Sequence, residues 1–147
     1  MTTYSTPDNF KQPVLQYMAG KNDFVLIEDY IFTWTLAGIE RKLYFPAGQD
    51  YDKASVPPIL WGLARPDGPF EASSLAHDLI WLYKGRLPKG WYQTKVKGEW
   101  VDGSPWNTKQ SNDLFEWMSV LGGASKAKAK MYRTFVELYP PNWFKRF

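Results

Sequence analysis

Prolines and glycines divide this chain of 147 residues into one strand-patterned part and three helix-patterned segments. In residues 30–36, aromatic residues alternate with β-branched ones, which is the period of a half-buried strand. A turn containing Gly38 follows, and residues 41–46 alternate in the same way. The two alternating runs therefore predict a β-hairpin.

Three later segments have the apolar spacing of amphipathic helices, at residues 70–83, about 108–121 and about 125–139. Residues 91–101 alternate around a Lys97-Gly98 turn, which predicts a small second hairpin, or β-wing. The expected fold class is α+β: an N-terminal β-hairpin followed by three helices, with the β-wing between the first two helices.

The two ends of the chain lack this periodicity. Residues 1–22 predict an N-terminal arm, residues 23–139 a single α+β domain, and residues 140–147 an aromatic-basic tail. The arm and the tail hold six aromatic residues whose apolar surface is costly to leave in water. They therefore either fold back onto the domain or dock onto another protein. We expect docking for the tail, because Pro140-Pro141 directs it away from the third helix.

The composition excludes several kinds of site. The chain has no cysteine, which excludes a disulfide framework, cysteine-ligated zinc, iron–sulfur clusters and a thiol nucleophile. Its single histidine excludes a site that needs two imidazoles. The net charge of +3 is small and the basic run at residues 126–133 fits a solvated helix face, so no nucleic acid is expected. No apolar run is long enough for a transmembrane segment and no signal peptide precedes the domain, so we expect synthesis in a cytoplasm.

The single histidine, His77, is followed directly by Asp78 in the first predicted helix. Neighbours on a helix point about 100° apart, so the two side chains cannot hold one ligand side by side. His77 can instead act as a base while Asp78 offers its oxygens to a cation. The alternative interpretation is that His77 is a half-buried helix residue and Asp78 lies at the polar border.

Asp113, in the first turn of the second predicted helix, is the candidate partner of His77. A carboxylate that reaches the imidazole across an antiparallel helix pair fixes its tautomer and stabilises the imidazolium. The alternative is an electrostatic role, because a carboxylate is favoured near a helix N-terminus.

A proline-braced loop at residues 49–58 carries Asp52 and Ser55. Such a loop can supply oxygen ligands to a hard cation, and we expect Asp52 and Asp78 to share it, with Ser55 in the same site loop. The alternative is that these side chains bond to their own backbone and stiffen a turn.

The candidate residues lie in four blocks that resemble a known family. The blocks are, in order, Phe45-Pro46-Ala47-Gly48, Asp52-Lys53-Ala54-Ser55-Val56-Pro57, Ala76-His77-Asp78, and Asn112-Asp113-Leu114-Phe115 with Met118. They resemble the bacteriophage and bacterial family catalogued as domain of unknown function 1353, whose pattern is P-x-G…D-x-A-S-V-P…H-D-x-x-Y…A-D-x-x-F. Trp81 stands where the family usually has Tyr, and Asn112 replaces Ala before Asp113. The resemblance implies a phage or prophage origin and supplies no activity.

The order of His77-Asp78, β-wing and Asp113 is also similar to calcium-dependent phospholipases of the A-two type, secreted and parvoviral. In those enzymes the His activates water, the adjacent Asp binds calcium and the distant Asp orients the His. The likeness implies a catalytic dyad of His77 and Asp113 and an optional calcium ion on Asp78 and Asp52. This chain departs from those enzymes in having no Gly-rich calcium loop before His77 and no disulfides.

Two functions from different classes follow. The first is a bacteriophage virion-associated protein of the tail or attachment region, which binds other virion proteins or copies of itself through the arm and the tail and enters the virion. The alternative is a hydrolase, phospholipase-like or directed at the cell envelope, which uses His77 and Asp113 with an optional divalent cation. A sugar-binding surface built from the eight Trp residues is less favoured, because most of them also fit core positions.

Overall fold

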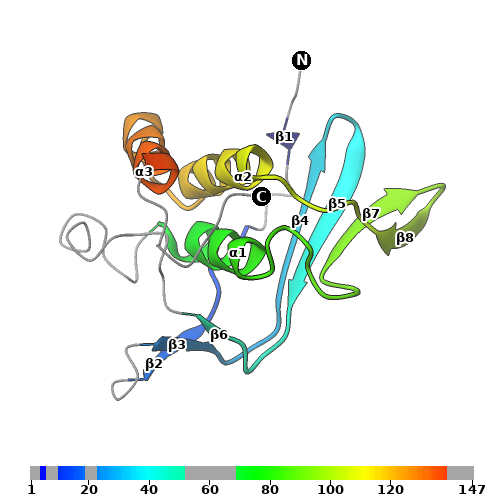
Figure 1. Cartoon of the computed structure of the whole chain (residues 1–147), viewed down its shortest axis with the longest axis horizontal. Helices are drawn as coiled ribbons and strands as arrows, with labels where there is room; N and C mark the ends of the chain where they lie inside the picture. The colour runs from blue at the N-terminus through cyan, green and yellow to red at the C-terminus, as the bar shows by residue number, and fades with distance from the viewer. Residues whose placement is uncertain (1–3, 6–9, 19–22, 52–68, 139–147) are drawn as a thin grey trace.

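The computed structural model describes residues 4–5, 10–18, 23–51 and 69–138, and Figure 1 shows their arrangement. Within these ranges there are two β-sheets and three α-helices, which confirms the α+β class. In chain order the elements are β1 (Tyr4–Ser5), β2 (Leu15–Met18), β3 (Asp23–Leu26), β4 (Tyr30–Leu36), β5 (Ile39–Phe45), β6 (Asp50–Tyr51), α1 (Glu71–Leu82), β7 (Tyr92–Val96), β8 (Glu99–Asp102), α2 (Thr108–Leu121) and α3 (Lys126–Leu138).

The larger sheet has the strand order β1-β4-β5-β7-β8, and each neighbouring pair is antiparallel. β4 and β5 form the predicted hairpin, in which Leu36 pairs with Ile39. The two residues between them, Ala37 and Gly38, have φ angles of 55° and 77°. Two successive positive φ angles give the tight turn whose twist matches that of the flanking strands, and glycine adopts them at little cost.

The predicted second hairpin forms from β7 and β8, but it is part of the main sheet and not a separate wing. β7 pairs with β5, with Leu43 opposite Tyr92. In Figure 1 the hairpin projects beyond the helices as the outermost part of the sheet. Alternation along a strand shows which face is buried and leaves open which strand lies beside it, so the sequence did not predict this pairing.

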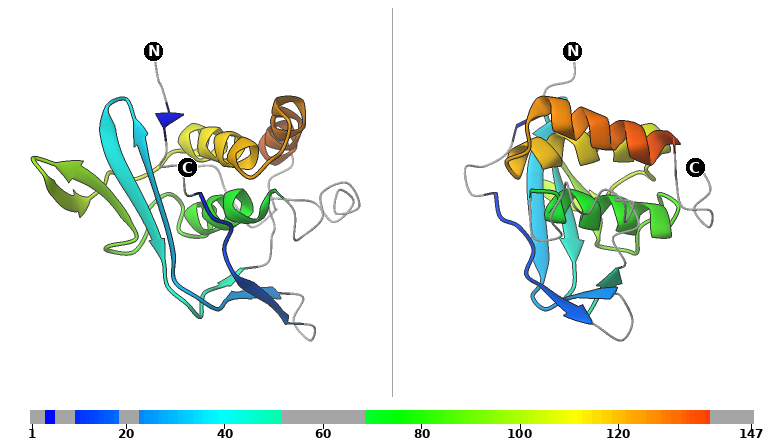
Figure 2. Two further views of the ribbon diagram at one scale, coloured as in Figure 1. Left: turned by 180° about the vertical axis from the view of Figure 1, so that it is seen from behind. Right: turned by 90° about the vertical axis from the view of Figure 1, so that its left-hand side faces the viewer.

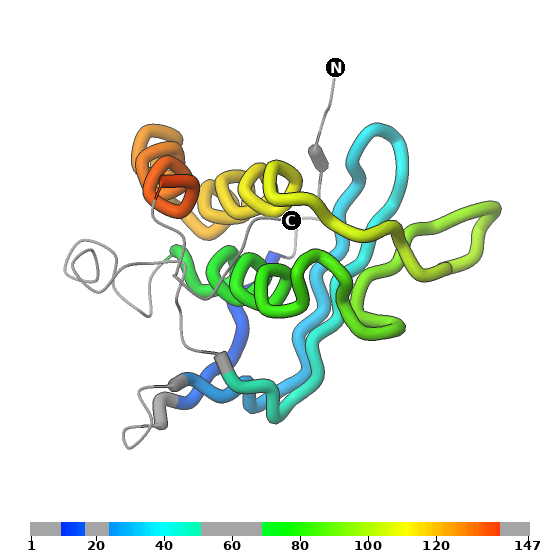
Figure 3. The backbone as a smooth tube through the Cα atoms, in the orientation of Figure 1, coloured from blue at the N-terminus to red at the C-terminus, as the bar shows by residue number. Residues whose placement is uncertain are grey.

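The described part of the predicted arm belongs to the folded domain. β1 pairs with β4, and β2 pairs with β3 in a smaller sheet of order β2-β3-β6. Phe10 packs edge-on against Phe32, with 5.8 Å between ring centroids. Figure 3 follows this N-terminal segment past α1 into β2. Residues 4–5 and 10–18 thus fold back onto the domain, which is one of the two alternatives expected for the arm, whereas the predicted tail at 140–147 lies outside the described residues.

Three segments meet where α1 begins. The Gln12 side chain accepts a hydrogen bond from the Ala72 backbone N–H (2.9 Å) and donates one to the Pro69 carbonyl oxygen (3.3 Å). Gly122, just after α2, lies against the same two residues: an added Cβ would overlap the Pro69 carbonyl oxygen and lie 2.6 Å from Gln12 Nε2. The end of α2 therefore approaches the start of α1 so closely that only a residue without a side chain fits.

The three helices lie on one side of the larger sheet, as Figures 1 and 2 show. Their bounds agree with the predicted ones to within one residue at each described end. α1 is buried along its length from Ala72 to Trp81, because the sheet covers one side of it and α2 another. α2 begins with a capping box, in which Asn107 and Gln110 exchange side-chain-to-backbone hydrogen bonds of 2.7 and 2.9 Å. No helix of the described residues has the length and hydropathy needed to cross a membrane.

Aromatic residues form much of the core between the sheet and the helices. On β4 the side chains alternate as predicted: Phe32 and Trp34 are buried, and Ile31 is 59% exposed on the opposite face. The main cluster joins β4 and β5 to α1 and α2. A second cluster, which includes Phe115 of α2 and Tyr132 of α3, holds α3 on the outer side of α2.

Candidate functional site

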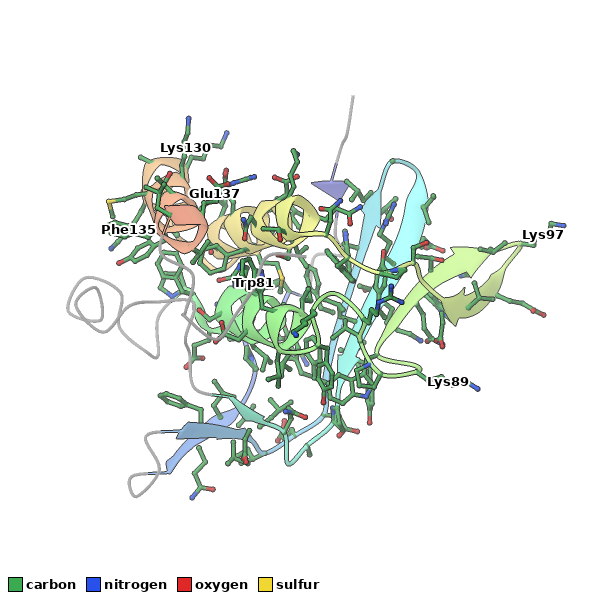
Figure 4. All side chains as sticks on the ribbon, in the orientation of Figure 1. Trp81, Lys89, Lys97, Lys130, Phe135 and Glu137 are labelled. Atoms are coloured by element: carbon green, nitrogen blue, oxygen red, sulfur yellow. The ribbon has the colours of Figure 1, made fainter. Side chains whose placement is uncertain are left out.

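A row of polar side chains joins α1 to α2. On α1 the row consists of Ser73, His77 and Trp81, which are four residues apart and so lie on one face of the helix. Figure 4 shows Trp81 between the two helices. Higher residue numbers on α1 meet lower ones on α2, so the helices are antiparallel, as expected. The hydrogen bonds are Ser119 Oγ to Ser73 Oγ (2.9 Å), His77 Nε2 with Asn112 Oδ1 (2.7 Å), and Trp81 Nε1 to Ser111 Oγ (2.7 Å).

His77 is held in one orientation. With Asn112 Oδ1 as the acceptor, the ring donates through Nε2, and in a neutral imidazole the lone pair is then on Nδ1. The imidazole stacks on the Trp81 ring at 5.2 Å and meets the edge of Phe115 at 5.3 Å. His77 Nδ1 lies 3.9 Å from Asp78 Oδ1, which is too long for a direct hydrogen bond. Both side chains are almost excluded from solvent, with 4% and 3% exposed.

Asp113 points elsewhere, which corrects the expected dyad. Its carboxylate lies 2.8 Å from Lys109 Nζ and 2.5 Å from Arg133 Nη1 on α3, and its side chain is 26% exposed. Neighbouring residues on a helix point about 100° apart, so Asn112 and Asp113 cannot both face α1. The residue that contacts His77 is therefore Asn112, and Asp113 serves the contact between α2 and α3.

The spacing of the family pattern contains the signal that identifies Asn112. In A-D-x-x-F the Phe comes three residues after the Asp, and Phe115 comes three residues after Asn112. Alignment on Phe115 assigns Asn112 to the Asp position and Ser111 to the Ala position. The contact between Phe115 and the His77 ring supports this alignment. The resemblance then implies a carboxylate at the position where this chain has the neutral amide of Asn112.

Trp81 changes the same site in a second way. It occupies the position where the pattern has Tyr, and its Nε1–H donates to Ser111 Oγ. Ser111 Oγ in turn donates to the backbone carbonyl of Thr108 in the first turn of α2. The two departures noted in the sequence, at Trp81 and Asn112, therefore lie side by side in one buried network.

The predicted cation site is described only in part. Asp78 supplies one buried carboxylate beside His77, whereas Asp52 and Ser55 lie outside the described residues. Among the residues that the structure does describe, no three His, Asp or Glu side chains are grouped so that they could hold a metal ion. The shared calcium site of Asp78 and Asp52 stays a prediction.

Arg133 is the charged centre of the contact between α2 and α3. Its guanidinium lies 2.8 Å from Glu137 and 3.5 Å from Glu116, besides the contact with Asp113. Burial lowers the pKa of Arg133, but the hydrogen bonds and negative charges of Glu137 and Asp113 outweigh this effect, so the net pKa is raised. This surface network is separate from the uncharged hydrogen bonds between α1 and α2.

Comparison with family models relates these elements to other proteins. The model described as "Protein of unknown function (DUF1353)" matches residues 24–135, from β3 into α3. The chain belongs to the DUF1353 family. The match includes both His77 and Asn112, so the buried pair lies within the family domain. Searches of curated proteins and of solved structures find no match for this DUF1353 chain.

Proposed function

We propose that this DUF1353 chain is a hydrolase in which His77 acts as the general base through Nδ1. The observation that carries the proposal is the 2.7 Å hydrogen bond between His77 Nε2 and Asn112 Oδ1. With Asn112 Oδ1 as the acceptor, a neutral imidazole has its proton on Nε2 and its lone pair on Nδ1, on the side of Asp78. A general base needs such a fixed tautomer and direction.

The proposed reaction is the hydrolysis of an ester. Nδ1 takes a proton from a water molecule while the water oxygen forms a bond to the ester carbonyl carbon. The resulting imidazolium then gives this proton to the leaving alkoxide as the ester C–O bond breaks. His77 ends in its starting form, and the products are a carboxylic acid and an alcohol. Because His77 and Asp78 are almost fully buried, the interface between α1 and α2 must open to admit water and the ester.

The neutral partner of His77 sets the expected rate. A carboxylate would stabilise the imidazolium by its charge, whereas the Asn112 amide only orients the ring. We therefore expect a slow enzyme, and we expect Asn112→Asp to be faster by about tenfold or more, because it restores the charge to a ring that is already positioned.

Vesicles of phosphatidylcholine and phosphatidylglycerol are the first probe, because the His-Asp order is similar to that of phospholipases. Release of fatty acid is measured for the full chain, with calcium and with a chelator. Asn112→Asp should release more than the wild type, and His77→Gln should release none. Asp113→Asn is the matched control, since it removes a carboxylate one residue away that does not contact His77, and it should equal the wild type.

The vesicle assay has outcomes that contradict the proposal. Equal release by His77→Gln would assign the activity to another site. A loss of release in Asp113→Asn in place of a gain in Asn112→Asp would restore the original dyad. No release by the wild type and by Asn112→Asp would remove the phospholipase-like function.

The burial of the same residues favours a second candidate, a virion-associated protein in which the His-Asp motif serves only the fold. In that case the hydrogen bonds between α1 and α2 stabilise the domain, and the function is to bind other virion proteins or further copies of the chain. Mass spectrometry of purified particles from a phage that encodes the chain tests this role. Absence of the chain from the particles would contradict it.

A further inference from the structure

A cavity of about 650 Å³ lies between the larger sheet and the first turns of α2. β4, β5, β7 and β8 contribute to its lining, together with residues 103–106 and α2. Its volume is in the range of roughly 300–1,000 Å³ that small-molecule sites occupy. Neither His77 nor Asn112 lines it, so it is distinct from the proposed catalytic site.

Arg41 lines this cavity, and no carboxylate of the described residues forms an ion pair with it. Its Nη1 donates to Tyr92 Oη at 2.9 Å and its Nη2 to the Leu36 carbonyl oxygen at 3.4 Å. Its Nε is buried and has no hydrogen-bond partner. Partial burial of a guanidinium without an ion-pair partner costs free energy, and an anion that binds to it offsets this cost.

Trp106 brings a second unsatisfied donor to the same cavity. Its Nε1 is also buried without an acceptor. Its ring packs against Tyr92, with 4.9 Å between centroids. Buried N–H groups are nearly always hydrogen-bonded in folded proteins, so two unsatisfied donors on residues that line one cavity make this cavity the place to look for an acceptor from outside the chain.

The other charges around the cavity are already engaged. Lys95 lies 3.2 Å from Glu40, and Asp113 is held by ion pairs from α2 and α3. Asp102 accepts a backbone N–H at 3.0 Å. Arg41 is thus the lining cation without a carboxylate partner among the described residues, and an anion can bind beside it if it stays clear of the negative charge of Asp102.

We propose that this cavity binds an organic carboxylate with an apolar ring. Arg41 Nε and Trp106 Nε1 are covered in the empty cavity, so both side chains turn toward the ligand when it binds, and its carboxylate then accepts hydrogen bonds from them. The ring lies against Tyr92 and Trp106, with Leu36 and Leu114 as further apolar walls. Charge-assisted hydrogen bonds to guanidinium and stacking on aromatic rings are the two contacts that hold such a ligand.

NMR titration of the ¹⁵N-labelled full chain tests the proposal with benzoate, phenylacetate and indole-3-acetate as probes. The chain has eight Trp residues, and the indole signal that disappears in Trp106→Phe identifies Trp106. We expect saturable shifts of the Trp106 Nε1–H and Arg41 Nε–H signals with at least one carboxylate. Phenylacetamide, which lacks the charge, and inorganic phosphate, which lacks the ring, should bind much more weakly.

Variants separate this site from nonspecific attraction. Arg41→Met should weaken carboxylate binding by about tenfold or more, because it removes the charge-assisted contact. Lys95→Met is the matched control: it removes a cation from the same cavity, but one that is paired with Glu40, and it should leave the affinity nearly unchanged. Trp106→Phe gives a second test if Arg41→Met does not fold, and it should also weaken binding.

Three results would overturn the proposal: no saturable shift with any of the carboxylates, equal binding of phenylacetamide, or unchanged affinity in the Arg41 and Trp106 variants. Binding of inorganic phosphate alone would overturn it too, since it would assign Arg41 to an inorganic-anion site.

Discussion

Two regions of the molecule differ in how far their buried polar groups are hydrogen-bonded: the interface between α1 and α2, and the cavity beside β7. At the interface, His77 and Trp81 each have a hydrogen-bond partner on α2. At the cavity, Arg41 Nε and Trp106 Nε1 are buried and have none. The same helix, α2, contributes residues to both regions.

This difference distinguishes polar groups that hold the fold from those that we propose to serve a ligand. Removing one member of a buried hydrogen-bonded pair leaves the other member buried without a partner, which costs the desolvation free energy of that group. Removing a group that has no hydrogen bond costs little. The two regions should therefore respond to matched substitutions with effects of different size.

The largest effect is expected for Asn112→Leu, which keeps the approximate size of the side chain and removes the acceptor for His77 Nε2–H. The stranded donor should lower the free energy of unfolding by about 2–3 kcal/mol. Urea denaturation followed by circular dichroism measures this change. A loss below about 0.5 kcal/mol would show that the pair is not important for stability, and the contrast between the regions would fail.

Tyr30 extends the comparison to a satisfied group outside α2. Its hydroxyl donates to the Lys11 carbonyl oxygen at 2.6 Å, and burial raises its pKa above the ordinary value. The unfolded chain therefore loses this proton near pH 10 while the folded chain keeps it, so the stability is fully present below about pH 10 and falls above it. The slope from this one group is about 1.4 kcal/mol per pH unit.

Denaturation at a series of pH values from 8 to about 11 measures the alkaline loss. Tyr30→Phe should flatten it, and Tyr83→Phe serves as a tyrosine control on the part-exposed end of α1. An identical alkaline loss in the wild type and in Tyr30→Phe would contradict the assignment to Tyr30.

A smaller effect is expected for Asp113→Asn, which weakens the ion pairs with Lys109 and Arg133. Both Asp113 and Arg133 are partly exposed, so solvent screens their charges and the loss should be about 0.5–1 kcal/mol. The effect should shrink in high salt. Equal losses at low and high salt would indicate a packing role in place of a charge role.

The smallest effect is expected for Arg41→Met in the absence of ligand. The substitution removes a hydrogen bond to Tyr92 but also a buried N–H without an acceptor, so the free energy of unfolding should change by less than about 0.5 kcal/mol in either direction. A loss as large as that of Asn112→Leu would mean that Arg41 supports the fold, and the two regions would no longer differ.

Local patterns were sufficient to predict the elements. The alternation in β4 and β5 and the apolar spacing of the three helices each depend on a few neighbouring residues, and all of these elements form. Two features depend on distant partners and were not predicted: the pairing of β7 with β5 and the addition of β1 to β4. Pairing across such separations is decided by packing, which no local period records. The smaller sheet was also not predicted, although β2 and β3 are neighbours in the chain, because β2 is short and lies in the segment predicted as an arm.

The residue of α2 that contacts His77 was predicted one position away from the one observed, Asp113 in place of Asn112, and the catalytic role of His77 stays a prediction. The sequence identified His77, its antiparallel partner helix and the segment around Asp113. Asp113 was favoured because a carboxylate that reaches the imidazole fixes its tautomer and stabilises the imidazolium, which an amide does not do. On a helix one residue changes the direction of a side chain by about 100°, which here separates the buried interface from the contact with α3.

The junction of Gln12, Pro69 and Gly122 has a consequence for the order in which the domain forms during synthesis. Gln12 leaves the ribosome early, but its backbone partners at α1 come more than fifty residues later, and Gly122 follows near the end of the chain. During synthesis the segment around Gln12 therefore cannot form all of these contacts until α2 has been made. Contacts of such long sequence separation slow folding, so we expect the domain to close late and in one step.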